Sequence, residues 1–249
     1  MKISIGVLLL TLLFSFPLFS QDKGVDFGVD LASRYIWRGA DYGRSPSIQP
    51  RLEFSFGKLQ VGAWGAFTTS QFNTGKAKSF VQETDIYINY DINEMFSLSF
   101  TDYFFPDDAL AANNYYNFDK DKTGHIFEGT VNFNGTKNLP ISIMLATNFY
   151  GADAKNADGN IFYSTYIELG YSKNWKGTDL DFFIGGTPNT ADTKKKESGF
   201  YANSPNIVNI GITASKEIKV TDNFKIPVSV SFITNPDTQN VFFVFVMSF

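Results

Sequence analysis

Apolar and polar side chains alternate along this chain in segments of about ten residues, from position 25 to its last residue. Successive side chains of a β-strand point to opposite faces, so the alternation predicts strands that separate two different environments. In the first segment, Val25, Tyr35 and Trp37 are expected on one face, and Arg34 and Arg38 on the other. We expect twelve strands, over residues 25–37, 47–56, 59–68, 80–90, 96–105, 125–133, 141–150, 161–171, 178–184, 207–214, 226–233 and 241–249.

The predicted connections alternate between short and long. The short ones lie near residues 57, 91–95, 134–140, 173–177 and 215–224, and the longer ones over residues 39–46, 69–79, 106–124, 151–160, 185–206 and 234–240. Transmembrane β-barrels have an even number of strands, short periplasmic turns and longer extracellular loops. The sequence therefore predicts an all-β fold: a 12-stranded antiparallel transmembrane β-barrel over residues 21–249, with short periplasmic turns and long extracellular loops.

The placement of lysines separates this prediction from a soluble barrel or sandwich, which would alternate too. Lysines fall in predicted loops, turns and strand ends but in no strand centre, and a lysine that faces lipid at the bilayer midplane costs about 2–4 kcal/mol. Aromatic residues gather at strand ends, as in the girdles of membrane barrels. Examples are Trp37, Phe67, Phe80, Phe149, Tyr150, Tyr171 and Trp175.

Residues 1–20 have the features of a cleaved signal peptide: a basic Lys2, an apolar core and the small Ser20 before a cut at Gln21. We therefore expect export, and location in the bacterial outer membrane. The last strand ends on Phe249, which resembles the C-terminal assembly signal of outer-membrane proteins. The expected partners are outer-membrane lipid, the barrel-assembly machinery, periplasmic chaperones, and small solutes or ions.

Composition excludes several kinds of chemistry. The chain has no Cys and one His, which removes thiolate chemistry, Cys-ligated zinc and multi-histidine metal centres, so neither a metal nor a cofactor is expected. A net charge of −4 argues against nucleic-acid binding. An enzyme is not expected: a Ser–His hydrolase would need His125, which has the parity of the lipid-facing Phe127. Glu83 and Asp85 share a face and could act as a glycosidase pair, but paired carboxylates also line cation-selective pores.

Several motifs between residues 33 and 106 resemble those of the TorF-type porins, a family of exported bacterial outer-membrane proteins. They are Ser33-Arg-Tyr-Ile-Trp-Arg-Gly39, Pro46-Ser-Ile-Gln49, Gly62-Ala-Trp64 and Gln82-Glu-Thr-Asp-Ile-Tyr87, followed by Tyr103 and Pro106. The resemblance implies an outer-membrane barrel with a porin-like activity. Phe242, Val244 and Val246 fall on the lumen face of the last strand, which argues against a wide, water-filled pore.

The predicted lumen is acidic. Tight turns would place Arg34 opposite Arg51, then Trp64, Glu83 and Tyr103 on successive strands; with Arg38, Glu53 and Asp85 these are the candidate lumen or selectivity residues. The arginines either form ion pairs inside the barrel or a track for a substrate. The expected inward carboxylates are Asp26, Asp30, Glu53, Glu83, Asp85, Glu128, Glu168, Asp179 and Asp181, against inward Arg34, Arg38 and Arg51.

These features predict a porin-like channel for passive diffusion of small solutes or ions, with a preference for cations. Residues 106–124 and 185–206 are expected to narrow its mouth. A closed barrel with a structural or surface-interaction role is the alternative, and an outer-membrane hydrolase is a third, less favoured one. The pattern does not specify the solute or the oligomeric state.

Overall fold

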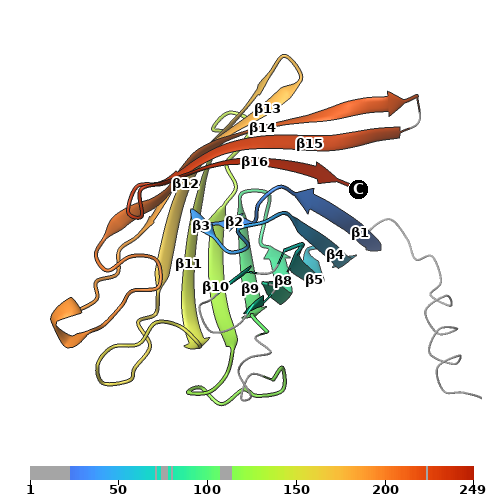
Figure 1. Ribbon diagram of the computed structural model, residues 1–249. Helices are drawn as coiled ribbons and strands as arrows, with labels where there is room; N and C mark the ends of the chain where they lie inside the picture. The colour runs from blue at the N-terminus through green and yellow to red at the C-terminus, as the bar shows by residue number, and fades with distance from the viewer. Residues whose placement is uncertain (1–22, 71, 74–77, 80, 107–113, 223) are drawn as a thin grey trace, which may run out of the picture.

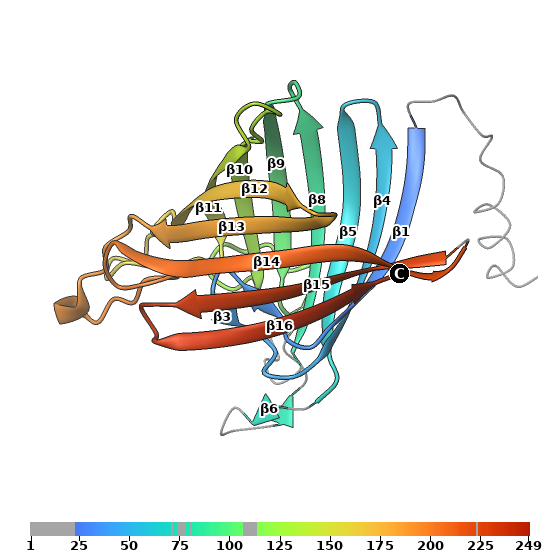
Figure 2. The same ribbon diagram turned by 90° about the horizontal axis from the view of Figure 1, so that it is seen from above.

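The structure is a computed structural model that describes residues 23–70, 72–73, 78–79, 81–106, 114–222 and 224–249. The predicted signal peptide and Phe80 lie outside these residues. Twelve of the strands form a closed antiparallel barrel in the order β1-β16-β15-β14-β13-β12-β11-β10-β9-β8-β5-β4 (Figures 1 and 2). The predicted fold class and strand count are therefore confirmed.

The barrel strands are β1 (Lys23–Ala32), β4 (Ser47–Phe56), β5 (Leu59–Thr68), β8 (Gln82–Asp91), β9 (Phe96–Phe104), β10 (His125–Phe133), β11 (Ile141–Gly151), β12 (Thr165–Trp175), β13 (Thr178–Thr187), β14 (Asn206–Thr221), β15 (Phe224–Asn235) and β16 (Asn240–Ser248). Two small hairpins stand apart from the barrel sheet: β2 (Ile36–Trp37) with β3 (Ala40–Asp41), and β6 (Phe72–Asn73) with β7 (Lys78–Ser79). A short 3-10 turn, η1 (Thr193–Lys195), lies between β13 and β14.

The first and last strands close the barrel. The pairs Asp30↔Ser248, Leu31↔Met247 and Ala32↔Val246 are in register, and Val29 and Phe249 exchange two backbone hydrogen bonds of 2.9 Å. This seam is short because the chain ends halfway along β1 (Figure 1). The predicted closure between the two strands is confirmed, and the terminal residue completes it.

We call the end of the barrel with the short connections the turn end and the opposite end the loop end. The β14–β15 hairpin extends further at the turn end than predicted (Figure 1). Residues 215–224 were expected to form a turn, but Glu217 and Lys219 alternate with Ile218 and Val220. The segment is therefore a strand with two different faces, and it pairs with residues 224–229.

The outward faces of the strands are apolar through their central parts. Side chains of Leu, Ile, Val and Phe on these faces are about two-fifths exposed, which is unusual for so many large apolar groups. No helix among the described residues is long and apolar enough to cross a bilayer. The outward residues include Phe54, Ile88, Leu98, Phe100, Val131, Ile143, Leu145, Leu169, Phe182, Phe232 and Phe243.

The inward faces carry mostly small and polar side chains. Thr213 and Ser231 share a hydrogen bond of 2.8 Å across neighbouring strands. Large inward side chains are accommodated opposite glycine: the ring of Tyr87 lies over Gly62, where a Cβ atom would come within 2.3 Å of it. The alternation predicted from the sequence is therefore that of an apolar exterior and a polar interior.

The first strand is shorter than predicted, and this is the main correction to the sequence interpretation. β1 ends at Ala32, and residues 33–46 turn into the barrel at the loop end before β4 begins (Figures 1 and 2). Tyr35 and Trp37 were expected on the outer surface as a continuation of β1. They lie inside the ring of strands instead, because the chain leaves the wall two residues before Tyr35. We call residues 33–46 the plug.

Candidate functional site

The plug is a compact loop built around a two-residue hairpin. β2 and β3 pair through Ile36↔Asp41 and Trp37↔Ala40, and the turn between them is made by Arg38 and Gly39, both at positive φ (47° and 78°). At the base of the hairpin, Arg34 forms an ion pair of 3.0 Å with Asp41. The turn points the Arg38 side chain toward the barrel wall opposite β1.

Arg38 connects the plug to three barrel elements. Its guanidinium makes two hydrogen bonds to the carboxylate of Glu128 on β10, one of them 2.9 Å long, and a further one to the Tyr201 hydroxyl in the β13–β14 loop. Its Cζ atom lies 4.4 Å from the ring centre of Trp37 and 4.7 Å from that of Tyr166 on β12. The side chains of both charged partners are almost fully buried, at 8% and 1% exposure.

Aromatic rings fill the space between the plug and the part of the wall formed by β5 and β9. Tyr35 packs against Trp64 of β5, with ring centres 5.4 Å apart, and Trp37 packs edge-on against Tyr103 of β9 at 5.5 Å. Tyr42 lies between Tyr35 and Trp37. Burial, helped by the nearby Glu83 carboxylate, raises the pKa of Tyr42 to about 12, so its hydroxyl stays neutral in the physiological range.

The tip of the plug touches the last strands of the barrel. A Cβ atom at Gly39 would come within 2.0 Å of the Val208 carbonyl oxygen on β14, and the Gly39 carbonyl accepts a hydrogen bond of 3.2 Å from Asn235 on β15. Together with the contacts to β5, β9, β10 and β12, this means that the plug crosses the whole cross-section of the barrel. The plug therefore narrows the lumen near the loop end and leaves a hollow of about 150 Å³ beside Arg38 and Gly39.

A Gly39→Ala substitution is expected to displace the plug. Alanine at positive φ is strained, and its methyl group would meet the β14 backbone, so we expect a loss of more than about 2 kcal/mol of unfolding free energy. Urea unfolding of the refolded barrel would measure this loss. Gly24→Ala on β1 is the matched control, because a Cβ atom there meets nothing within 4 Å. Equal stability of the two variants would contradict the tight contact at the tip.

Glu83 and Asp85 lie on β8 beside the plug, at 1% and 5% exposure. Each has one carboxylate oxygen that is buried without a hydrogen-bond partner among the described residues. The register differs by two residues from the predicted one: Trp64 and Tyr103 both pair with Asp85, and Glu83 pairs with Ala66. The predicted register assumed a tight turn between β5 and β8, whereas this connection contains the β6–β7 hairpin.

The other candidate residues divide between the plug and a wider chamber toward the turn end. Arg51 pairs with Trp64 as predicted, but its strand neighbour on the other side is Gly28, and Arg34 belongs to the plug. Arg51 forms an ion pair of 2.6 Å with Asp26, and Glu53 accepts a hydrogen bond from the Tyr87 hydroxyl. The three predicted inward arginines thus each form an ion pair, which is the first of the two predicted alternatives, and they form no track along one wall because Arg34 and Arg38 leave β1 with the plug.

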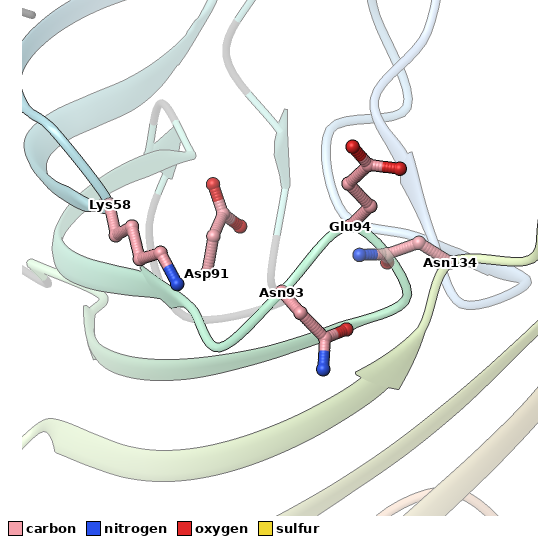
Figure 3. A pocket seen from close by; sticks show the side chains of 5 residues that line it. All are labelled: Lys58, Asp91, Asn93, Glu94 and Asn134. Carbon is pink, nitrogen blue, oxygen red and sulfur yellow. The ribbon is translucent and has the colours of Figure 1, made fainter.

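A hollow of about 600 Å³ opens at the turn end (Figure 3). Charged and amide side chains from three turns line it: Lys58, Asp91, Asn93, Glu94 and Asn134. Lys58 donates a hydrogen bond of 2.8 Å to the Ile92 carbonyl across neighbouring turns. In the described part of the chain, no group of three or more His, Asp and Glu side chains is arranged to hold a metal ion.

Sequence reasoning missed several residues of this site. Tyr201, Tyr166 and Asn235 hold the plug from strands and loops that lie far away in the sequence, and no local pattern marks them. From the predicted narrowing segment 185–206, Tyr201 and the buried Ala202 pack against Tyr166 of β12. The described part of residues 106–124 instead covers the outer face of β9 and β10.

Comparisons with known proteins find similarity among solved structures. No protein-family model matches the sequence, and no curated protein matches it. Among solved structures, the COG4313 outer membrane channel from Pseudomonas putida F1 is 12% identical in sequence, with a TM-score of 0.42, over 94% of this chain and 97% of that one.

Proposed function

We propose that the protein is an outer-membrane barrel that forms a channel for small solutes or ions, with the plug as its gate. The observation that carries the membrane location is the continuous apolar exterior of a closed barrel whose interior is polar. Only a closed barrel or a helix satisfies all backbone hydrogen bonds within a bilayer. Export through the signal peptide at residues 1–20, and assembly by the barrel-assembly machinery and periplasmic chaperones, belong to the same proposal. So does membership of the TorF-type porins, which rests on the motifs in residues 33–106.

Two features support gating: the lumen is polar, and the plug is a connection that is not part of any barrel strand. Small and polar side chains line the lumen below the plug, and a polar hollow opens among the turns at the opposite end. The plug itself is a connection between two paired strands, Ala32↔Ser47, so it could move without breaking the barrel wall. Passive diffusion then depends on how often the plug leaves its position.

The gate can be tested by shortening the plug. Because Ala32 and Ser47 are direct neighbours, residues 34–45 can be replaced by Asn-Gly, a pair that favours tight hairpin turns. We expect the refolded wild-type protein to give small, intermittent conductance in planar bilayers, and the shortened variant to give a larger, steady conductance. The β6–β7 loop, shortened in the same way, is the control. Absence of conductance from a folded, shortened variant would support the alternative, a closed structural or surface-interaction barrel.

That alternative has one specific observation in its favour: the plug is bonded to the wall on several sides, including the buried Arg38–Glu128 pair. A hydrolase is not proposed, since His125 is 0% exposed in the described structure and no nucleophile is hydrogen-bonded to it. The shortened variant separates the channel from the closed barrel.

We predict a preference for cations. Asp26, Asp30, Glu53 and Asp181 face the chamber below the plug, where Arg51 is the inward arginine, and carboxylates in a low-dielectric pore concentrate cations and repel anions. In a salt gradient, the reversal potential of the shortened-plug channel should lie toward the equilibrium potential of the cation. The shift should be smaller at 1 M salt, where the Debye length falls to about 3 Å. Asp30→Asn with Glu53→Gln should reduce the shift. Glu83→Gln with Asp85→Asn should reduce it only when the plug is displaced. A reversal potential of anion-selective sign would reject the charge argument.

Deletion of Phe249 is expected to leave the protein in the periplasm or degraded. The residue supplies two of the backbone hydrogen bonds at a short seam, and its terminal aromatic ring resembles an assembly signal. Immunoblots of outer-membrane and periplasmic fractions would measure the distribution, with Phe249→Tyr as the control that keeps an aromatic end. Normal outer-membrane levels of the deletion variant would refute the prediction.

A further inference from the structure

An ionisable pair interrupts the apolar exterior near the loop end. Asp102 on β9 and His125 on β10 share the parity of Phe100 and Phe127, which face outward on the same strands. The Nδ1 atom of His125 lies 2.7 Å from a carboxylate oxygen of Asp102. The sequence-based parity of His125 is thus confirmed, but its imidazole is fully buried rather than facing lipid.

Residues 114–124, which we call the strap, cover this pair from outside the barrel. The Tyr115 carbonyl oxygen lies 2.7 Å from the Nε2 atom of His125. The Phe118 ring stacks on the imidazole with ring centres 4.5 Å apart, and Phe104 packs on it at 4.6 Å. A second anchor is the hydrogen bond of 2.6 Å from the Tyr150 hydroxyl to the Phe118 carbonyl.

The two hydrogen bonds of His125 fix how many protons the pair holds. A carbonyl oxygen only accepts, so Nε2 must carry a hydrogen. Nδ1 then either donates to an ionised Asp102 from a doubly protonated ring, or accepts from a protonated Asp102. Both arrangements contain one proton more than a neutral histidine beside an ionised aspartate, which is the usual state of the two groups in water near pH 7.

We propose that His125 and Asp102 form a proton-dependent latch that holds the strap against the outer wall of the barrel. Loss of one proton leaves a neutral imidazole that can donate to only one of its two acceptors. If it keeps Asp102, the Nε2 lone pair faces the Tyr115 carbonyl and the strap loses its central contact. The ratio of latched to released molecules therefore rises as pH falls and decreases as pH rises, by up to tenfold per pH unit.

The other titratable groups around the imidazole do not account for such a response. On the strap, burial and the nearby Asp102 charge raise the pKa of Tyr115 above its ordinary value near 10. Tyr150 on β11 also carries a phenol, and Glu128 on β10 faces the lumen. The strap's acidic side chains are exposed and lie in surface ion pairs, Asp119 with Lys122 and Asp121 with Lys155.

The proton count can be measured directly because the chain has a single histidine. Nitrogen-15 NMR of the histidine-labelled protein, refolded in micelles, gives one imidazole to follow with pH. We expect Nε2 to be protonated at pH 7, with Nδ1 either protonated or hydrogen-bonded to a protonated carboxyl. A neutral ring with its hydrogen on Nδ1, titrating near pH 6.5 as in free histidine, would overturn the proposal.

Hydrogen–deuterium exchange of the strap tests the consequence, after correction for the intrinsic effect of pH on exchange. From about pH 6.5, where a released imidazole takes its own proton, protection should fall by up to tenfold per pH unit as pH rises. Asp102→Asn is the matched control: its amide can donate to Nδ1 while Nε2–H donates to Tyr115, so both hydrogen bonds survive with a neutral ring. Its strap should stay protected with little pH dependence. Wild-type protection that does not change with pH, or the same slope in both proteins, would overturn the latch.

Discussion

Leu98→Arg on β9 is expected to block assembly, whereas Ser99→Arg next to it should give a folded barrel. Leu98 points outward in the middle of the strand at 42% exposure, and an arginine facing lipid at the bilayer midplane costs about 2–4 kcal/mol. Ser99 points into the lumen between Asn89 and Thr130, where a long basic side chain does not face lipid. The two neighbours therefore test which face of the strand meets lipid.

Folding yields in lipid vesicles, read from the heat-sensitive mobility of the barrel on gels, would compare the two variants. Ser97→Arg is a second lumen-facing control on the same strand. Equal yields for Leu98→Arg and Ser99→Arg would reject the assignment of the two faces, and with it the membrane location.

Arg38→Ala is expected to destabilise the folded protein by about 3–5 kcal/mol and to free the plug. The substitution leaves the Glu128 carboxylate buried without its ion-pair partner, and such an uncompensated charge is costly. It also removes the cation–π contacts of the guanidinium with the rings of Trp37 and Tyr166. A larger conductance and a lower urea midpoint should therefore appear together.

Two comparisons make this result specific. Arg34→Ala breaks an ion pair on the same loop that is partly exposed, and should cost less than about 1 kcal/mol. Adding Glu128→Gln to Arg38→Ala should restore part of the stability, because no unpaired charge then remains, but it should leave the plug free. Unchanged stability and conductance in Arg38→Ala would show that the pair does not hold the plug.

Strand positions were predictable because one face of each strand is continuously apolar. Leu59–Thr68 and His125–Phe133 match the predicted bounds, since glycine or polar turn residues flank them. The end of β1 was not predictable in this way. Arg34 and Arg38 keep the polar parity of β1, and Tyr35 and Trp37 keep its apolar parity, after the chain has left the wall. The plug places its aromatic groups against other rings and its charged groups against carboxylates, and this pattern resembles the alternation of a strand.

The candidate site was predictable as a set of residues but not as an arrangement. The sequence pointed to Arg38, Trp64, Asp85 and Tyr103, and the structure brings all four to the plug or to the wall around it. Their partners could not be inferred, since Glu128, Tyr166 and Tyr201 are fixed by the closure of the barrel rather than by any local spacing. The buried His125–Asp102 pair was missed because its cover comes from a loop, and loops carry no alternation.

The plug also has a consequence for the order in which the molecule folds. Its bonds join positions 90, 163 and 196 residues apart, from Arg38 to Glu128, from Arg38 to Tyr201, and from Asn235 to Gly39. Contacts over such separations form slowly, because the entropy of closing a long loop is lost before the contacts contribute any stabilising energy. We therefore expect the first connection of the chain to dock only after β10, β14 and β15 are in place, so that the earliest loop in the sequence is among the last parts of the molecule to reach its final position.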